Sequence, residues 1–107
     1  MNHVEFFRAI AEDPRITPLH ISLYMALLYL KELRPIGELR VYSCEVMRLA
    51  KISSPNTYRK GMRDLDAFGY MIFEPSFDPA QGSKVILSER AMHSGGKDVS
   101  VWRNRSY

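Results

Sequence analysis

Apolar residues recur at helical spacing in the middle of the chain, first in a short stretch and then in a longer one. In residues 43–51, Val46, Leu49 and Ala50 share one face, which predicts a short helix. Ser43 stands at the position of a helix N-cap. The three residues that follow are too few for anything but a turn.

The longer stretch predicts a second helix over residues 54–68. Ser54 is a suitable N-cap, and Pro55 suits the first helical position because its missing N–H needs no partner there. Gly69 is suited to end the helix in a left-handed conformation. Its inward stripe has steps of 4, 3 and 3 and consists of Tyr58, Met62, Leu65 and Phe68.

Two predicted strands follow this helix, over residues 70–73 and 85–87. Residues 75–84 form a polar, proline- and glycine-containing loop between them, and residues 40–42 are a candidate third strand. This order predicts a winged helix-turn-helix: a mainly α fold with a small β-hairpin wing (α+β). We expect three to four helices and a two- or three-stranded antiparallel sheet.

Two more helices are predicted before this region. Residues 4–11 form a short amphipathic stretch in which the adjacent Phe6 and Phe7 cannot both face one core, so packing on a second copy or a wide buried face are the alternatives. Residues 19–33 are apolar over much of the helix circumference, which predicts the central core helix.

A threonine–proline pair precedes the core helix and repeats the cap-plus-proline start. The threonine is Thr17, and His20 lies in the first turn, where it is expected at the surface or hydrogen-bonded. The helix is too short and too polar to span a bilayer.

The 107 residues correspond to one domain, predicted over residues 1–90, followed by a basic tail over residues 91–107. The tail contains Trp102, which packs on the domain or on a neighbouring chain, or lies along nucleic acid. Residues 1–50 hold six basic and six acidic residues, so the whole net charge of +3 lies in the second half. This asymmetry favours a nucleic-acid face there.

One cysteine, Cys44, excludes an internal disulfide and is expected to be a half-buried filler. The N-terminus lacks a signal-peptide pattern, so a cytoplasmic protein is expected. The three histidines are dispersed, and Asp64 and Asp66 point about 200° apart on a helix. The sequence contains no motif for catalysis, a cofactor, a metal ion or a small-molecule ligand.

The predicted chemistry is recognition of double-stranded DNA. A helix fits the major groove, where Asn can pair with adenine and Arg with guanine, while Lys and polar wing residues contact phosphates. The base-reading candidates are Asn56, Thr57, Arg59 and Arg63. The phosphate and wing candidates are Lys51, Ser54, Lys60, Gln81, Ser83 and Lys84.

Simpler interpretations stand beside these. A basic helical face is often only solvated, Thr57 could serve the helix cap alone, and Tyr58 matches the core register. Gly61 marks the close approach of another helix or has no special role. The rival function is a protein-interaction module in replication or conjugation machinery, and a third hypothesis is single-strand binding by the tail.

The segments ITPLHISLYMALLYL and MRLAKISSPNTYRKGMRDLDAFGYMIFEPSFDPAQGS resemble small winged-helix regulators of Bacteroidetes, many of them encoded on mobile elements. They are more distantly similar to the N-terminal winged-helix domains of DnaD-like replication initiators. The resemblance covers residues 16–87 and implies a sequence-specific or replication-linked DNA-binding role. Where that family commonly has glycine in the turn before the second helix, this chain has Ser53.

Overall fold

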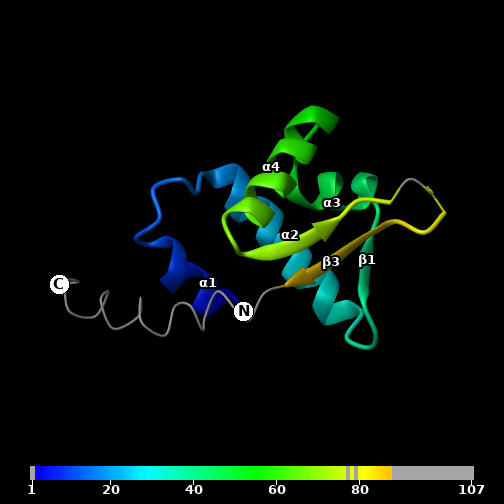
Figure 1. Ribbon diagram of the computed structural model, residues 1–107, viewed down its shortest axis with the longest axis horizontal. Helices are drawn as coiled ribbons and strands as arrows, with labels where there is room; N and C mark the ends of the chain where they lie inside the picture. The colour runs from blue at the N-terminus through cyan, green and yellow to red at the C-terminus, as the bar shows by residue number, and fades with distance from the viewer. Residues whose placement is uncertain (1, 77, 79, 88–107) are drawn as a thin grey trace.

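The computed structural model describes residues 2–76, 78 and 80–87, so the predictions for the tail lie outside the described residues. Four helices and three strands follow one another along the chain (Figure 1). They are α1 (His3–Ile10), α2 (Pro18–Leu33), β1 (Leu39–Val41), α3 (Ser43–Ala50), α4 (Pro55–Ala67), β2 (Met71–Glu74) and β3 (Ser83–Leu87). The predicted α+β winged-helix layout is confirmed.

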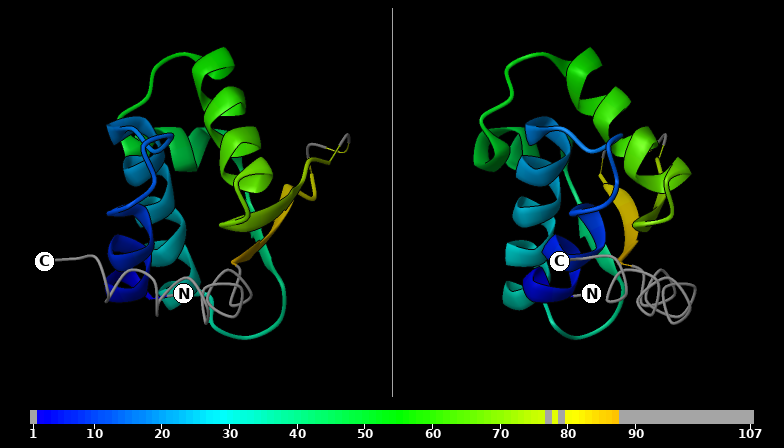
Figure 2. Two further views of the ribbon diagram at one scale, coloured as in Figure 1. Left: turned by 60° about the vertical axis from the view of Figure 1, so that its left-hand side comes forward. Right: turned by 90° about the vertical axis from the view of Figure 1, so that its left-hand side faces the viewer.

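The three strands form an antiparallel sheet with β3 in the centre, between β1 and β2. Leu39 and Phe73 lie opposite Val85 from either side, and this buried row faces the helices. Because strand side chains alternate, the next row, Arg40 with Lys84 and Glu74, lies on the outer face. Figure 2 shows the helices gathered on one side of the sheet.

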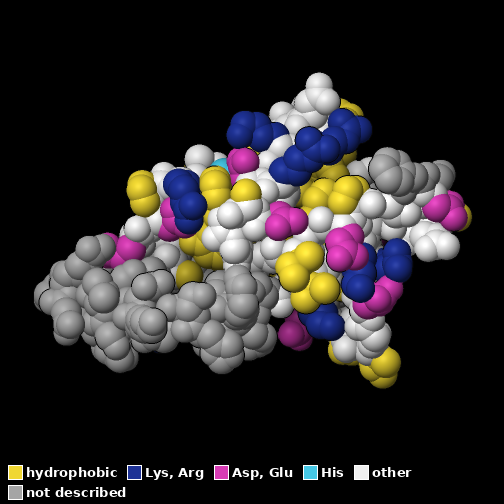
Figure 3. Space-filling view, in the orientation of Figure 1, with side chains coloured by type: hydrophobic (Ala, Val, Ile, Leu, Met, Phe, Trp, Pro, Cys, Tyr) yellow, Lys and Arg dark blue, Asp and Glu magenta, His cyan; other side chains and the backbone are white. Residues whose placement is uncertain are grey.

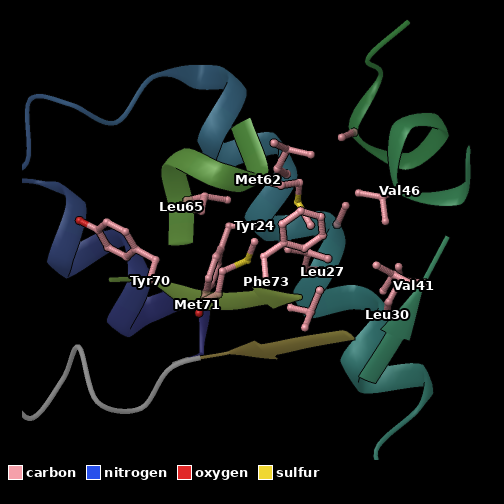
Figure 4. Packing of buried hydrophobic residues seen from close by; sticks show 14 of the residues in the cluster. Tyr24, Leu27, Leu30, Val41, Val46, Met62, Leu65, Tyr70, Met71 and Phe73 are labelled. Atoms are coloured by element: carbon pink, nitrogen blue, oxygen red, sulfur yellow. The ribbon is translucent and has the colours of Figure 1, made fainter. Parts of the chain in front are cut away.

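The core lies between α2, α3, α4 and the inner face of the sheet (Figure 4). The prediction that α2 is the central core helix is confirmed, since Leu23, Tyr24 and Leu27 are fully buried. Ser22 also joins α2 to the end of α3, because its hydroxyl donates a hydrogen bond of 2.5 Å to the carbonyl of Ala50.

Helices α2 and α4 approach most closely at Gly61, which is buried. A Cβ atom added there would collide with Cδ1 of Leu23 and would lie 3.3 Å from Cδ2 of Leu19. Of the two interpretations of Gly61, close approach of another helix is therefore the correct one. Tyr58, 4 % exposed, belongs to the core as its register indicated.

Helix α1 packs on the domain through the aromatic ring of Phe6, with the partly buried Ala9 and Ile10 beside it. The ring of Phe6 is fully buried and stacks on Tyr24 with 4.1 Å between centroids, and it meets Tyr70 edge-on at 5.7 Å. Phe7 points the other way and is 45 % exposed. A second copy that packed on this end would therefore meet Phe7 and not Phe6.

The turn between α1 and α2 is held by a polar cluster. Asp13 accepts hydrogen bonds from the Tyr70 hydroxyl at 2.6 Å and from Nε and Nη2 of Arg15 at 2.8 and 2.9 Å. The Arg15 guanidinium also lies 4.2 Å from the ring centre of Phe68. The hydrogen bond from Arg15, helped by that from Tyr70, lowers the pKa of Asp13 from 3.8 to about 2.

The cap of α3 differs from its prediction, and the predicted start of α2 has a bond that was not predicted. Helix α3 begins after Tyr42, so Ser43 is the first helical residue and not the cap. The N–H of Tyr42 donates a hydrogen bond of 3.0 Å to the carboxylate of Glu45. Thr17 precedes α2 as predicted, and its N–H donates a hydrogen bond of 2.9 Å to Nδ1 of His20. In both cases a side chain of the first turn reaches back to the backbone.

Two burial predictions were wrong or incomplete. Cys44 is exposed, because it lies on the side of α3 opposite Val46 and Ala50. His20 is buried, 4 % exposed, so only the hydrogen-bonded alternative holds for it.

We expect Gly61→Ala to lower the free energy of unfolding by roughly 1 kcal/mol. Overpacking costs about 1–3 kcal/mol, and the higher helix propensity of alanine returns at most about 1. Urea denaturation measures the change, and shortening Leu23 to alanine should reduce the penalty. A gain in stability of about 1 kcal/mol, the usual result at an exposed helical glycine, would contradict this packing.

We expect the stability difference between the wild type and Asp13→Asn to depend on pH. The pKa of Asp13 is lowered in the folded state, so its contribution is present above about pH 4 and is lost as the pH falls toward 2. Denaturation at pH 6, 4 and 2 measures the difference. The exposed carboxylate of Glu32 on α2 provides a control variant, Glu32→Gln, and an equal pH dependence in both variants would contradict the prediction.

Candidate nucleic-acid interface

Helix α4 is the second helix of the helix-turn-helix, and its start has the predicted cap. The Ser54 hydroxyl accepts a hydrogen bond of 3.2 Å from the N–H of Thr57, and Pro55 is the first helical residue. Thr57 thus takes part in the cap through its backbone, which leaves its exposed side chain available.

The buried stripe of α4 fixes which side chains face outward. Tyr58, Met62 and Leu65 are buried against the core. The base-reading candidates and one phosphate candidate are all exposed: Asn56, Thr57, Arg59, Arg63 and Lys60. Figure 3 shows Lys and Arg side chains over α4 at the top of the molecule.

Two of the predicted base readers are already linked. Nη1 of Arg59 donates a hydrogen bond of 3.2 Å to Oδ1 of Asn56, one turn earlier on the helix. Both side chains are exposed and lie in the first two turns of α4. A base edge that takes the arginine would also free the amide of Asn56.

The two carboxylates of α4 are engaged with the protein itself. Asp64 accepts a hydrogen bond of 2.9 Å from Nε2 of His20 and one of 3.1 Å from Lys60. The bond from His20, and then that from Lys60, lowers the pKa of Asp64. Asp66 accepts a hydrogen bond of 3.1 Å from the N–H of Phe73 in β2.

The two arginines of α4 differ from Lys60 in their partners. Within the described ranges 2–76, 78 and 80–87, Arg59 and Arg63 form no ion pair with a carboxylate. The exposed face of α4 therefore carries two positive charges that are free to meet an external anion.

The buried histidine beneath this face has a defined tautomer. Nδ1 of His20 accepts the N–H of Thr17, so the proton of a neutral ring is on Nε2, which donates to Asp64. The Thr17 hydroxyl also lies 3.0 Å from Nδ1. His20 thus links the start of α2 to α4 and holds the carboxylate that binds Lys60.

The turn before α4 contains Lys51, exposed and in the left-handed conformation with φ 63°. Its neighbour one turn earlier, Arg48, is also exposed and has no ion pair in the part of the chain that the structure describes. Arg48 was not among the predicted contacts, although its spacing from Cys44 and Lys51 puts it on the exposed stripe of α3.

The wing residues divide into two groups. Gln81 is exposed in the loop, which spans residues 75–82 and not 75–84. Ser83 and Lys84 belong to β3, because they pair with β1 opposite Val41 and Arg40.

The ammonium of Lys84 lies 3.3 Å from Glu38, which also binds Arg40 at 2.7 Å. The charge of Lys84 is therefore compensated by Glu38, and Lys84 does not add to the basic face of α4. Sequence spacing could not reveal this pair, since 46 positions separate the two residues.

Two other kinds of site were sought in the described residues. No group of three or more His, Cys, Asp or Glu side chains there is arranged to hold a metal ion. None of the helices there is both long and apolar enough to cross a membrane.

Comparisons with protein-family models, with curated proteins and with solved structures found no match for this chain. The resemblance to winged-helix regulators therefore stays a prediction, and any function has to be argued from the geometry.

Proposed function

We propose that this protein binds double-stranded DNA, with α4 in the major groove and loop 75–82 as the wing, and that it acts as a transcriptional regulator. The observation that carries the proposal is the uncompensated positive charge on α4. Arg59 and Arg63 are exposed, while Asp64 makes its bonds to His20 and Lys60 within the protein.

This charge pattern suits a duplex. An arginine in the first turns of a helix can donate two hydrogen bonds to guanine, and an asparagine can pair with adenine. Arg59 and Asn56, linked at 3.2 Å, are one turn apart and lie near the N-terminal end of α4, the part of a recognition helix that meets base edges. Lys51, Lys60 and Arg48 are the proposed phosphate contacts.

The rival function is a protein-interaction module, and one observation favours it. Ile72 and Ile86 lie opposite each other on the outer face of the sheet and are 47 % and 41 % exposed. The homodimer hypothesis is supported, among the described residues, by the exposed ring of Phe7, and light scattering that gives the mass of one chain would exclude it. A dimer would read two half-sites about 34 Å apart.

Replacing both arginines, Arg59→Ala/Arg63→Ala, should abolish sequence selection. Each base contact is worth about 1–3 kcal/mol of discrimination. Fluorescence anisotropy with a random duplex library, over a series of salt concentrations, measures affinity, selection and the salt slope.

The control is Arg8→Ala/Lys31→Ala, which removes the same charge from α1 and α2. If the wild type and both variants bind duplexes equally weakly and without selection, the basic face is solvated or meets a protein partner. Deletion of residues 91–107 tests separately whether the tail binds single strands.

Asp64→Asn should raise DNA affinity about threefold, because it removes a negative charge beside Lys60 while the amide oxygen can still accept the bond from His20. The same variant should be less stable, since a charged acceptor is lost. Glu32→Gln changes the net charge equally on α2. An equal effect of the two variants on affinity would mean that Lys60 contacts no phosphate.

A further inference from the structure

We propose that Tyr42 is a positioning residue for the wing, and that it joins the wing to the helix-turn-helix so that both meet the duplex as one unit. The inference rests on the proposed function. It starts from the hydroxyl of Tyr42, which donates a hydrogen bond of 2.9 Å to the carbonyl of Ala80 in loop 75–82.

The returning part of the loop, residues 80–82, is fastened along the end of β1. Besides the bond from Tyr42, Nη1 of Arg40 donates to the carbonyl of Gly82 at 3.4 Å. Gly82 is buried with φ +70°, and a Cβ atom there would lie only 2.8 Å from the carbonyl oxygen of Val41. The loop thus passes against β1 so closely that only glycine fits without strain.

The loop itself is closed by Asp78. The N–H of Ala80 donates a hydrogen bond of 2.9 Å to the carboxylate of Asp78, and the N–H of Gln81 donates one of 3.0 Å to the Asp78 carbonyl. Tyr42 therefore holds a turn whose shape is already set, and the exposed side chain of Gln81 lies one residue beyond the carbonyl that Tyr42 binds.

The other end of Tyr42 belongs to the helix-turn-helix. Its N–H donates a hydrogen bond of 3.0 Å to Glu45 in the first turn of α3, and Glu45 accepts another of 2.6 Å from Arg34. The backbone of Tyr42 is thereby fixed where α3 begins. One residue consequently starts the first helix of the motif and holds the wing.

The role of this bond is positioning rather than core stability. Tyr42 is 42 % exposed, and its hydroxyl reaches the loop at the protein surface. A wing held in place before binding loses less conformational freedom on the duplex, which favours affinity. In Figure 1 the wing extends from β2 and β3 beyond the helices. A small change where it is anchored would therefore move its outer end by a larger distance.

The test is Tyr42→Phe in the full chain, with Tyr29→Phe as the control. Tyr29 is an exposed tyrosine on α2, so the control removes a hydroxyl without touching the wing. Hydrogen exchange of the Gln81 and Ser83 amides reports the wing. Anisotropy with the duplex that the wild type selects reports affinity and salt slope.

We expect faster exchange at Gln81 and an affinity lower by about fivefold, with the control unchanged. The salt slope should stay the same, because loop 75–82 carries no Lys or Arg. Unchanged exchange in Tyr42→Phe would overturn the inference. Faster exchange with unaltered affinity would overturn it too, while leaving the proposed function intact. A wild type that binds no duplex would refute both the proposed function and this inference.

Discussion

The orientation of α4 depends on its contact with α2 at Gly61. Leu23 fills the space that a side chain at this position would occupy, so the two helices pack closely there. Since Tyr58 and Met62 are buried on one side of the helix, Arg59 and Arg63 face outward. The direction of the basic face is thus a consequence of hydrophobic packing and not of the charges themselves.

Ion pairing then determines which charges on that face remain without a partner. Helix α4 carries five charged side chains. Lys60 and Asp64 neutralise each other, and Asp66 accepts a hydrogen bond from the N–H of Phe73. His20 holds the carboxylate of Asp64 from beneath through a bond of 2.9 Å. Among the described residues the two arginines have no carboxylate partner, whereas Lys60 is paired with Asp64.

Periodicity and cap residues predicted most of the fold. The bounds of α2, α3 and α4 agree with their predictions within a residue or two, because each helix carries its own apolar stripe and start signal. The N-cap of α3 and the start of β3 were less well predicted. The first depends on Glu45 reaching back to Tyr42, and the second on pairing with β1, 42 positions away.

The candidate site was predicted in composition but not in its connections. The exposed positions of Asn56 and Arg63 follow from the helix register alone. The engagement of Lys84 with Glu38, and of Asp64 with His20, could not be predicted, because the partners meet only through tertiary folding. Local patterns can indicate which charges are present, whereas the fold decides which of them remain free.

The left-handed backbone of Lys51 has a thermodynamic consequence. A residue with a side chain pays about 1 kcal/mol for this conformation, which glycine adopts freely. A sequence optimised only for a stable turn would therefore carry glycine at this position. Lysine there lowers the free energy of unfolding but places a positive charge at the junction of α3 and α4, which agrees with the phosphate contact proposed for Lys51.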